Sequence, residues 1–256
     1  MLRLVLLFAF ILPGYCYAEC SFQTANYLEK MSNPKAIKSI DIEIPKSSKF
    51  VRNQFKILLT NSGNIPGKLK KQFKANITIN YDFGSCVYHG KVRQSGDLKD
   101  HIKSMDWNQI TQSLDVNLKT GNILNAVRFK LLIPETRNGI SEVFATTILR
   151  NLGFIVPETF EVSTSINNVK TTMLFQERAE KELLERNLRR EGPIFRGDEI
   201  LMWSYKNFKN IELDMLSLST LYNKGWFKKG SSSQQIILNS YKKIQKASLK
   251  SRHQQG

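Results

Sequence analysis

The sequence predicts an α+β fold, in which a mixed or antiparallel sheet with one central helix is followed by a helical region. Three observations lead to this prediction. Several segments before Glu177 alternate apolar and polar residues, which is the period of a half-buried strand. Residues 140–148, which lie between such segments, space their apolar residues as a helix does. After Glu177 a charged helical pattern replaces the alternation.

The alternating segments define the strands of the expected sheet. In the first segment Ile40, Ile42 and Ile44 share one face, as in a strand with one buried side. The strands expected up to the central helix span residues 36–44, 73–81, 86–93, 113–119 and 126–133. In the last of them the apolar residues face one way, whereas Arg128 and Lys130 face the other.

Helices, loops and turns are expected between the strands. Residues 49–59 form a short amphipathic pattern, and residues 61–68 contain the glycines and proline of a loop. The central helix is expected to have Asn138 as its N-cap and Gly153 at its C-terminal end. The hairpin that follows is expected to comprise residues 159–165, a turn at Asn167-Asn168 and residues 169–175.

The region after Glu177 is predicted to be helical to its end, with a break at residues 230–233. Its first helix is expected over residues 178–190, and the apolar stripe of that helix is Leu183, Leu184 and Leu188. Arg189-Arg190 are interpreted as the charged last turn of this helix, where cations favour the helix dipole. The alternative is that the two arginines bind an anion.

The first 18 residues have the features of a cleavable signal peptide. A positive start at Arg3 precedes an unbroken apolar run, and small residues lie before a cleavage site after Ala18. The run is too short for a membrane anchor, which needs about 20 apolar residues. We therefore expect a signal peptide over residues 1–18, a sheet-rich domain over 19–177 and a helical segment over 178–256. The mature protein is expected to be secreted, periplasmic or extracellular, without a membrane span.

The net charge suits an anionic partner. It is +16, and it becomes +15 when the signal peptide, with its one arginine and no acid, is removed. Such a charge suits anionic partners, namely phosphates, anionic polymers such as glycans, nucleic acid or a lipid surface, and the alternative is a lysine-rich surface that serves solubility. Nucleic acid is a poor candidate because the charge is spread along the chain and because the protein is exported.

Cysteine usage suggests one cross-link. Cys16 leaves with the signal peptide, so that Cys20 and Cys86 remain in an oxidising compartment. A Cys20–Cys86 disulfide is one interpretation, and two buried thiols are the other. No metal site is expected, because the three histidines are scattered and the cysteines lack metal-ligand spacing.

The order strand, helix, hairpin and acidic junction is that of the small lobe of a kinase. In that lobe a strand lysine holds phosphates and a glutamate on the next helix pairs with it. Lys130 and Glu142 have the spacing that such a clamp needs. The alternative is that both are ordinary solvated surface charges.

Residues 90–198 resemble the spore-coat protein H (CotH) kinase family. The similarity begins at Val92-Arg93-Gln94-Ser95-Gly96, which is similar to the family's Arg-Gly-x-x-Ser stretch, and continues through the segment SEVFATTILRNLGF. It is strongest in VSTSINNVKTTMLFQERAEKELLE and in the following RREGPIFRGDE. The sequence departs from the family pattern at Gln94 and Asn168, which replace glycines, and it has no His-Arg-Asp or Asp-Phe-Gly motif.

The resemblance implies an ATP-dependent phosphotransferase of the protein-kinase type that works with Mg²⁺ or Mn²⁺. It implies that Lys130, together with Arg93, contacts phosphates, that Glu142 orients Lys130, and that Gln176 and Glu177 form the hinge. The catalytic acid is not identified, although Asp198, Glu199, Glu212 and Asp214 are available after the hinge. The second lobe is expected to be truncated. The alternative function is a non-catalytic envelope or cell-surface module that binds an anionic polymer.

Overall fold

The computed structural model describes residues 18–106, 109–197, 201–202, 205–207 and 218–253. The chain divides into two compact units, Met1–Arg178 and Ala179–Gly256. The predicted signal peptide lies outside the described residues except for Ala18.

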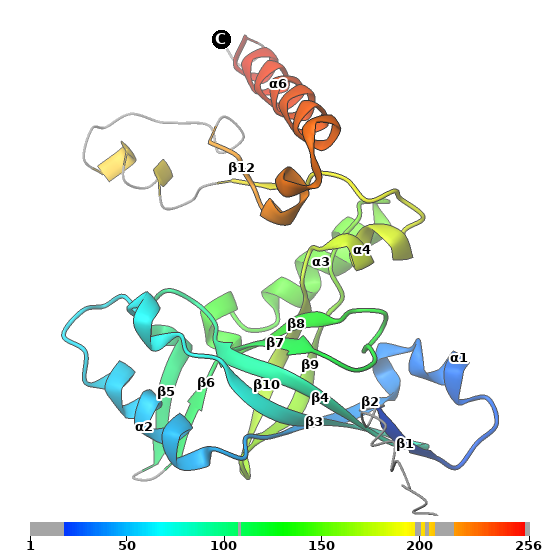
Figure 1. The fold of residues 1–256 in the computed structure, drawn as a ribbon, viewed down its shortest axis with the longest axis vertical. Helices are drawn as coiled ribbons and strands as arrows, with labels where there is room; N and C mark the ends of the chain where they lie inside the picture. The colour runs from blue at the N-terminus through cyan, green and yellow to red at the C-terminus, as the bar shows by residue number, and fades with distance from the viewer. Residues whose placement is uncertain (1–17, 107–108, 198–200, 203–204, 208–217, 254–256) are drawn as a thin grey trace, which may run out of the picture. The chain divides into compact units, whose positions relative to one another are not determined.

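The first unit contains an eight-stranded sheet that closes into a barrel (Figure 1). The strands are β1 Glu19–Phe22, β2 Ile37–Glu43, β3 Phe73–Tyr81, β4 Gly84–Gln94, β7 Leu114–Leu118, β8 Arg128–Leu132, β9 Thr159–Ile166 and β10 Val169–Glu177. Their order is β1-β4-β3-β2-β9-β10-β8-β7, and β7 also pairs with the second half of β4, which closes the ring. Every pair is antiparallel except β2–β9. Because helices accompany this sheet, the predicted α+β class is confirmed.

The inside of the barrel is filled by the apolar residues of the alternating pattern. One buried cluster includes Ile40, Ile42, Ile77, Ile79, Leu114, Val116, Phe129, Leu131, Met173 and Phe175. Phe175 stacks between Phe129 and Phe160, with ring centroids 4.7 Å apart in each pair. Since side chains alternate along a strand, the polar residues between them point outward from the barrel.

Helix α2, Ser47–Leu58, and the short hairpin of β5 Ile102–Asp106 and β6 Gln109–Gln112 form a second, smaller core. Ile57, Ile65, Ile102 and Ile110 are buried together there. The remaining short elements of the first unit are α1 Tyr27–Met31 and the 3-10 helices η1 Pro34–Ala36, η2 Gly67–Leu69, η3 Lys99–His101 and η4 Pro134–Arg137. The sequence pattern predicted α2 but neither β1 nor the β5–β6 hairpin.

The central helix is α3, Ser141–Asn151, and it packs on β9. The predicted N-cap is wrong, because Asn138 ends η4 in the left-handed region with φ 54°, and Ile140 stands at the N-cap without a side-chain hydrogen bond. Asparagine tolerates that region better than most residues do. The predicted C-terminal glycine is confirmed, since Gly153 has φ +83° and its N–H donates to the Arg150 carbonyl at 2.9 Å.

The predicted hairpin turn is also confirmed. Asn167 and Asn168 connect β9 and β10, and both have positive φ, 46° and 69°. Two consecutive left-handed residues make the tight turn whose twist matches the flanking strands. The Asn167 side chain further accepts a 2.7 Å hydrogen bond from the Ile44 N–H, which ties the turn to the end of β2.

The disulfide interpretation of the cysteines is confirmed, and the alternative of two thiols is not. Cys20 on β1 lies directly opposite Cys86 on β4, and the two are bonded. The bond attaches a four-residue, largely exposed edge strand to the buried core, where Cys86 is fully enclosed.

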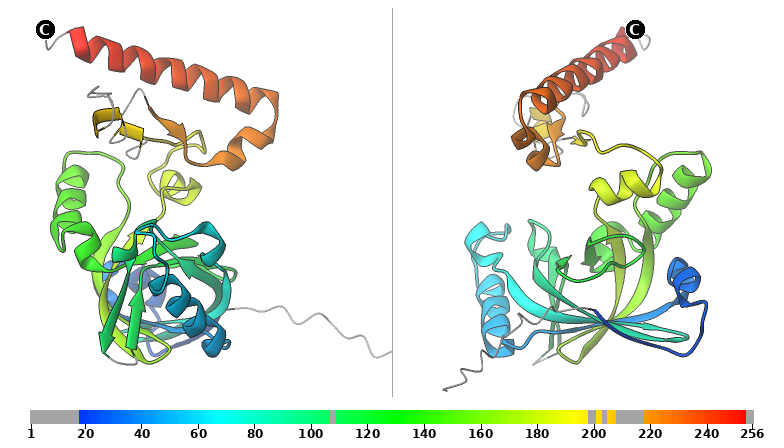
Figure 2. Two further views of the ribbon diagram at one scale, coloured as in Figure 1. Left: turned by 90° about the vertical axis from the view of Figure 1, so that its left-hand side faces the viewer. Right: turned by 45° about the vertical axis from the view of Figure 1, so that its right-hand side comes forward.

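The second unit contains α4 Lys181–Arg186, the strand pair β11 Phe195–Arg196 and β12 Thr220–Leu221, the 3-10 helix η5 Lys224–Lys229 and helix α6 Ser231–His253 (Figure 2). The prediction of one helix over residues 178–190 is wrong. Leu188 has φ 54° and is 94% exposed, so the helix ends before it and the stripe does not extend to it. The strand pair contradicts the expectation of a helical region to the end. No described helix is both long enough and apolar enough to cross a bilayer.

Candidate anion-binding site

Four of the residues singled out above belong to one face of the sheet or contact it. In the strand register Lys130 of β8 lies opposite Gln176 of β10. On its other side Lys130 lies opposite Asp115 of β7, and Asp115 lies opposite Arg93 of β4. Directly opposed residues of antiparallel strands share a face. Arg93, Asp115, Lys130 and Gln176 therefore form one row across the outside of the barrel.

The centre of this row is the carboxylate of Asp115, whose side chain is only 6% exposed. Arg93 donates to its Oδ2 from Nε at 3.0 Å and from Nη2 at 2.7 Å. Arg178 donates from Nη1 to Oδ2 at 2.9 Å and to Oδ1 at 3.2 Å, and Nη2 of Arg128 lies 3.9 Å from Oδ2. Three guanidinium groups thus surround one enclosed carboxylate, and Lys130 adds a fourth cation to the same face.

Glu142 reaches the row through Gln176. It lies in the first turn of α3, and its Oε1 accepts a 2.7 Å hydrogen bond from Nε2 of Gln176. The packing of α3 on β9 brings this turn beside the end of β10. The structure therefore connects Lys130, Gln176 and Glu142 in space, with Gln176 lying next to each of the other two.

Glu177 faces the opposite way. It is 2% exposed, its Oε2 accepts the Glu158 N–H at 3.0 Å, and its own N–H donates to the Glu158 carbonyl at 2.9 Å. The side chain therefore ties the end of β10 to the residue before β9, at the opposite end of the hairpin from its turn. Its assignment to a hinge stays a prediction.

Lys130 also acts electrostatically on a buried histidine. His101 is 8% exposed, and its Nδ1 lies 2.9 Å from the Ser113 hydroxyl, which accepts the Ile133 N–H at 3.0 Å. Burial lowers the pKa of His101, and the charges of Arg137 and Lys130 lower it further, whereas Asp100 and Asp97 raise it.

This lowered pKa predicts a loss of stability in acid. Unfolded His101 takes up a proton near pH 6.5, whereas the folded side chain resists protonation until a lower pH. The free energy of unfolding should therefore be highest above about pH 6.5 and fall as the pH passes through the folded pKa. Urea denaturation from about pH 7.5 to about pH 5 should show a smaller fall for His101→Gln than for the wild type. Equal falls in both proteins would exclude this histidine as the source.

Other predicted residues are not brought to this face or are not described. Arg189 and Arg190 follow the end of α4 rather than forming its last turn, so that interpretation is wrong. The reason is the left-handed Leu188, after which the Arg189 N–H bonds back to the Leu184 carbonyl. The available acids Asp198, Glu199, Glu212 and Asp214 lie outside the described residues. Within the described ranges, no group of three or more His, Cys, Asp or Glu residues could hold a metal ion.

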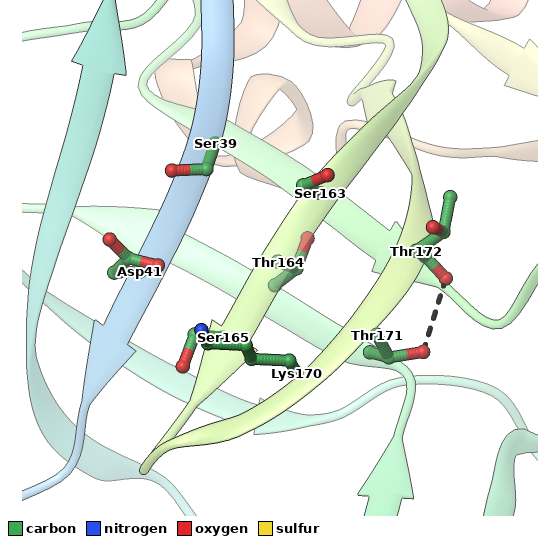
Figure 3. A pocket seen from close by; sticks show the side chains of 8 residues that line it. All are labelled: Ser39, Asp41, Ser163, Thr164, Ser165, Lys170, Thr171 and Thr172. Atoms are coloured by element: carbon green, nitrogen blue, oxygen red, sulfur yellow. Dashed lines mark hydrogen bonds between the residues drawn. The ribbon is translucent and has the colours of Figure 1, made fainter.

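One cavity on the barrel surface lies away from this row. It has a volume of about 590 Å³ and lies over β2, β9 and β10 (Figure 3). Its lining is Ser39, Asp41, Ser163, Thr164, Ser165, Lys170, Thr171 and Thr172. Asn80 holds part of the lining in place, donating from Nδ2 to Ser39 Oγ at 2.8 Å and to Asp41 Oδ2 at 2.6 Å. Its charged lining residues are Asp41 and Lys170, whose formal charges sum to zero. This cavity therefore lacks the excess of positive charge found in the row around Asp115.

Sequence reasoning missed Asp115, Arg128 and Arg178 as members of the site. The alternation of residues 114–118 places Asp115 on the face opposite Leu114 and Val116. It does not reveal that β4 and β10 bring arginines to both sides of that position. No protein-family model matches the chain, and no curated protein matches it. The resemblance to the CotH kinase family therefore stays a prediction from the residues.

Proposed function

We propose that the first unit is a nucleotide-binding lobe of the CotH kinase type, which holds the phosphates of ATP on the face around Asp115 and Lys130. The observation that carries the proposal is the excess of positive charge on this face. Among the described residues of this face there are four cations and two carboxylates, which are Arg93, Arg128, Lys130 and Arg178 against Asp115 and Glu142. A phosphate group would offset that excess.

The geometry supports oriented binding. Asp115 fixes the guanidinium groups of Arg93 and Arg178 through hydrogen bonds, so a bound phosphate would meet donors that are already held in place. Planar guanidinium donors match the oxygens of a phosphate well. Gln176 on β10 and Glu142 on α3 are hydrogen-bonded to each other at the edge of the same face. In a kinase lobe of this type, β8 would be the strand that carries the lysine, and α3 would be the helix that carries the glutamate. The β9–β10 hairpin would supply the strands that lead to the hinge.

The described residues support binding of ATP and not the transfer of its phosphoryl group. Phosphoryl transfer needs an acid that positions the substrate hydroxyl and groups that hold the metal, and in kinases the second lobe supplies them. The acids available after the hinge lie outside the described residues, so no step through Mg²⁺ or Mn²⁺ follows from the described side chains. We expect no phosphoryl transfer by this chain alone.

Lys130→Ala should lower the affinity for ATP about 10- to 100-fold, the equivalent of a lost hydrogen bond to a charged group. The fold should be preserved, because Lys130 lies on the outside of the barrel and is not fully buried. Isothermal titration calorimetry with ATP and Mg²⁺, and again with Mn²⁺, measures the affinity. Lys119→Ala is the matched control, since it removes an exposed lysine after β7. Equal affinities of Lys130→Ala and wild type, or no binding by the wild type, would refute the proposal.

A transfer assay with radiolabelled ATP tests the second half of the proposal. We expect no incorporation into the chain or into a model protein substrate with either metal. Robust transfer that disappears in Lys130→Ala would show that acids of the segment beyond the described hinge complete a catalytic site.

A further inference from the structure

A second concentration of positive charge lies on α2, away from the row around Asp115. A pocket of about 250 Å³ lies between α2 and the start of β3. Its lining is Lys49, Arg52, Asn53, Lys56, Lys71 and Phe73. Four of these six side chains are cations and none is an acid. Within the described part of the chain no carboxylate pairs with any of the four, although Lys38, Lys70 and Lys103 elsewhere each have an acidic partner.

The helix presents three separate faces. Phe50, Asn53, Gln54 and Ile57 are buried against the rest of the unit. Lys49, Arg52 and Lys56, spaced three and four residues apart, lie in a row about 10 Å long. Val51, Phe55 and Leu59, spaced four residues apart, form an exposed apolar stripe, with exposures of 39%, 45% and 80%. At 3.6 residues per turn the apolar stripe lies directly beside the row of cations.

Contacts with neighbouring residues fix part of the lining of this pocket. Asn53 donates from Nδ2 to the Leu69 carbonyl at 2.8 Å, which fixes the segment that carries Lys71. The ring of Phe73 packs edge-on against Phe50, with ring centroids 5.3 Å apart. The cations therefore surround two residues, Asn53 and Phe73, whose side chains are held in fixed positions.

This arrangement works against the stability of the isolated helix. Lys49 lies in the first turn of α2, where the helix dipole disfavours a cation, and that turn has no acidic residue and no side-chain cap. Arg52 is three residues from Lys49 and four from Lys56, which places like charges side by side. Local choices that conflict with stability are expected where function requires them. An anion in the pocket would offset these repulsions.

We propose that α2 docks on an anionic lipid surface, with a lipid phosphate in the cationic pocket and Val51, Phe55 and Leu59 inserted at the acyl boundary. A helix with cations beside an exposed apolar stripe has the character of an interfacial helix. The net charge of +16 complements the negative potential of such a surface. A soluble polyanion would use the cations but would leave the apolar stripe exposed. The proposal is independent of nucleotide binding around Asp115.

Co-sedimentation of the purified chain with vesicles tests the proposal. Vesicles of phosphatidylcholine with phosphatidylglycerol should bind the wild type, and pure phosphatidylcholine vesicles should not. Arg52→Gln should weaken binding to the anionic vesicles about fivefold, the effect of one cation near such a surface. Phe55→Ala should weaken it by about the same factor through lost apolar insertion. Lys119→Gln, with the same change of charge on another element, should bind nearly as the wild type does.

Dextran sulfate and a DNA oligonucleotide distinguish a lipid site from a general polyanion site. Phe55→Ala should retain whatever affinity the wild type has for either polymer, because neither polymer uses the apolar stripe. The melting temperature of Arg52→Gln should equal or exceed that of the wild type, since a repulsion is removed, and this separates a binding role from a structural one. Equal vesicle binding by Phe55→Ala and wild type would overturn the proposal in favour of a polyanion site. Binding to neutral vesicles as strong as to anionic ones would overturn it altogether.

Discussion

Loss of the Cys20–Cys86 disulfide should cost about 4 kcal/mol of stability, the chain-entropy value for a bond that closes a loop of this length. The two cysteines are 66 residues apart, and the enclosed loop contains α2, β2 and β3. The bond removes that much freedom from the unfolded chain and holds the edge strand β1 against β4. Urea denaturation of Cys20→Ala, followed by circular dichroism, measures the loss.

The choice of Cys20 for this substitution matters. Cys20 is exposed, whereas Cys86 is fully buried in the core, so Cys20→Ala leaves no cavity there. Treatment of the wild type with a reductant should reproduce the effect of the substitution, and the reductant should not change the variant further. A loss below about 1 kcal/mol would mean that the unfolded chain is already restricted or that β1 contributes little.

Asp115→Ala should destabilise the first unit by about 3 kcal/mol, the lower part of the range for a broken buried ion pair. The substitution leaves the guanidinium groups of Arg93 and Arg178 without the carboxylate that accepts their hydrogen bonds. Arg178 is 14% exposed and cannot recover full hydration, whereas Arg93, at 41%, recovers part of it. The same urea experiment measures the effect.

Two further measurements separate charge from shape at this position. Asp115→Asn keeps an acceptor oxygen and nearly the same volume, so a loss close to that of Asp115→Ala would assign the effect to charge. Added sulfate should restore part of the lost stability in Asp115→Ala more than in the wild type, because an anion can take the place of the carboxylate among the arginines. A loss below about 0.5 kcal/mol in Asp115→Ala would contradict the central role of this carboxylate.

Local patterns were sufficient where an element has one buried and one exposed side. The strand expected over residues 73–81 is β3, Phe73–Tyr81, because its alternate residues enter the barrel core. The tight turn at Asn167-Asn168 follows from the tolerance of asparagine for positive φ. The edge strand β1 was missed because its four residues are mostly exposed and show no alternation.

The C-terminal region shows the limit of local patterns. Leu183, Leu184 and Leu188 have helical spacing, but Leu188 adopts a left-handed conformation and α4 ends at Arg186. Spacing alone predicts which side chains could share a face, and it does not show whether a neighbouring element is present to bury them. The short pair β11–β12 was missed because each strand has only two residues, which is too few to show an alternation.

The sequence by itself determined the α+β class, most strands of the barrel, the pair of cysteines available for a bond and the candidate residues Arg93, Lys130, Glu142 and Gln176. Only the tertiary structure decided that the sheet closes, because the β2–β9 and β4–β7 pairings join segments far apart in the chain. Closure sets the register that places Arg93 and Lys130 on either side of Asp115. The enclosed carboxylate and its arginines depend on strands that meet only in the folded barrel, and no local pattern encodes that meeting.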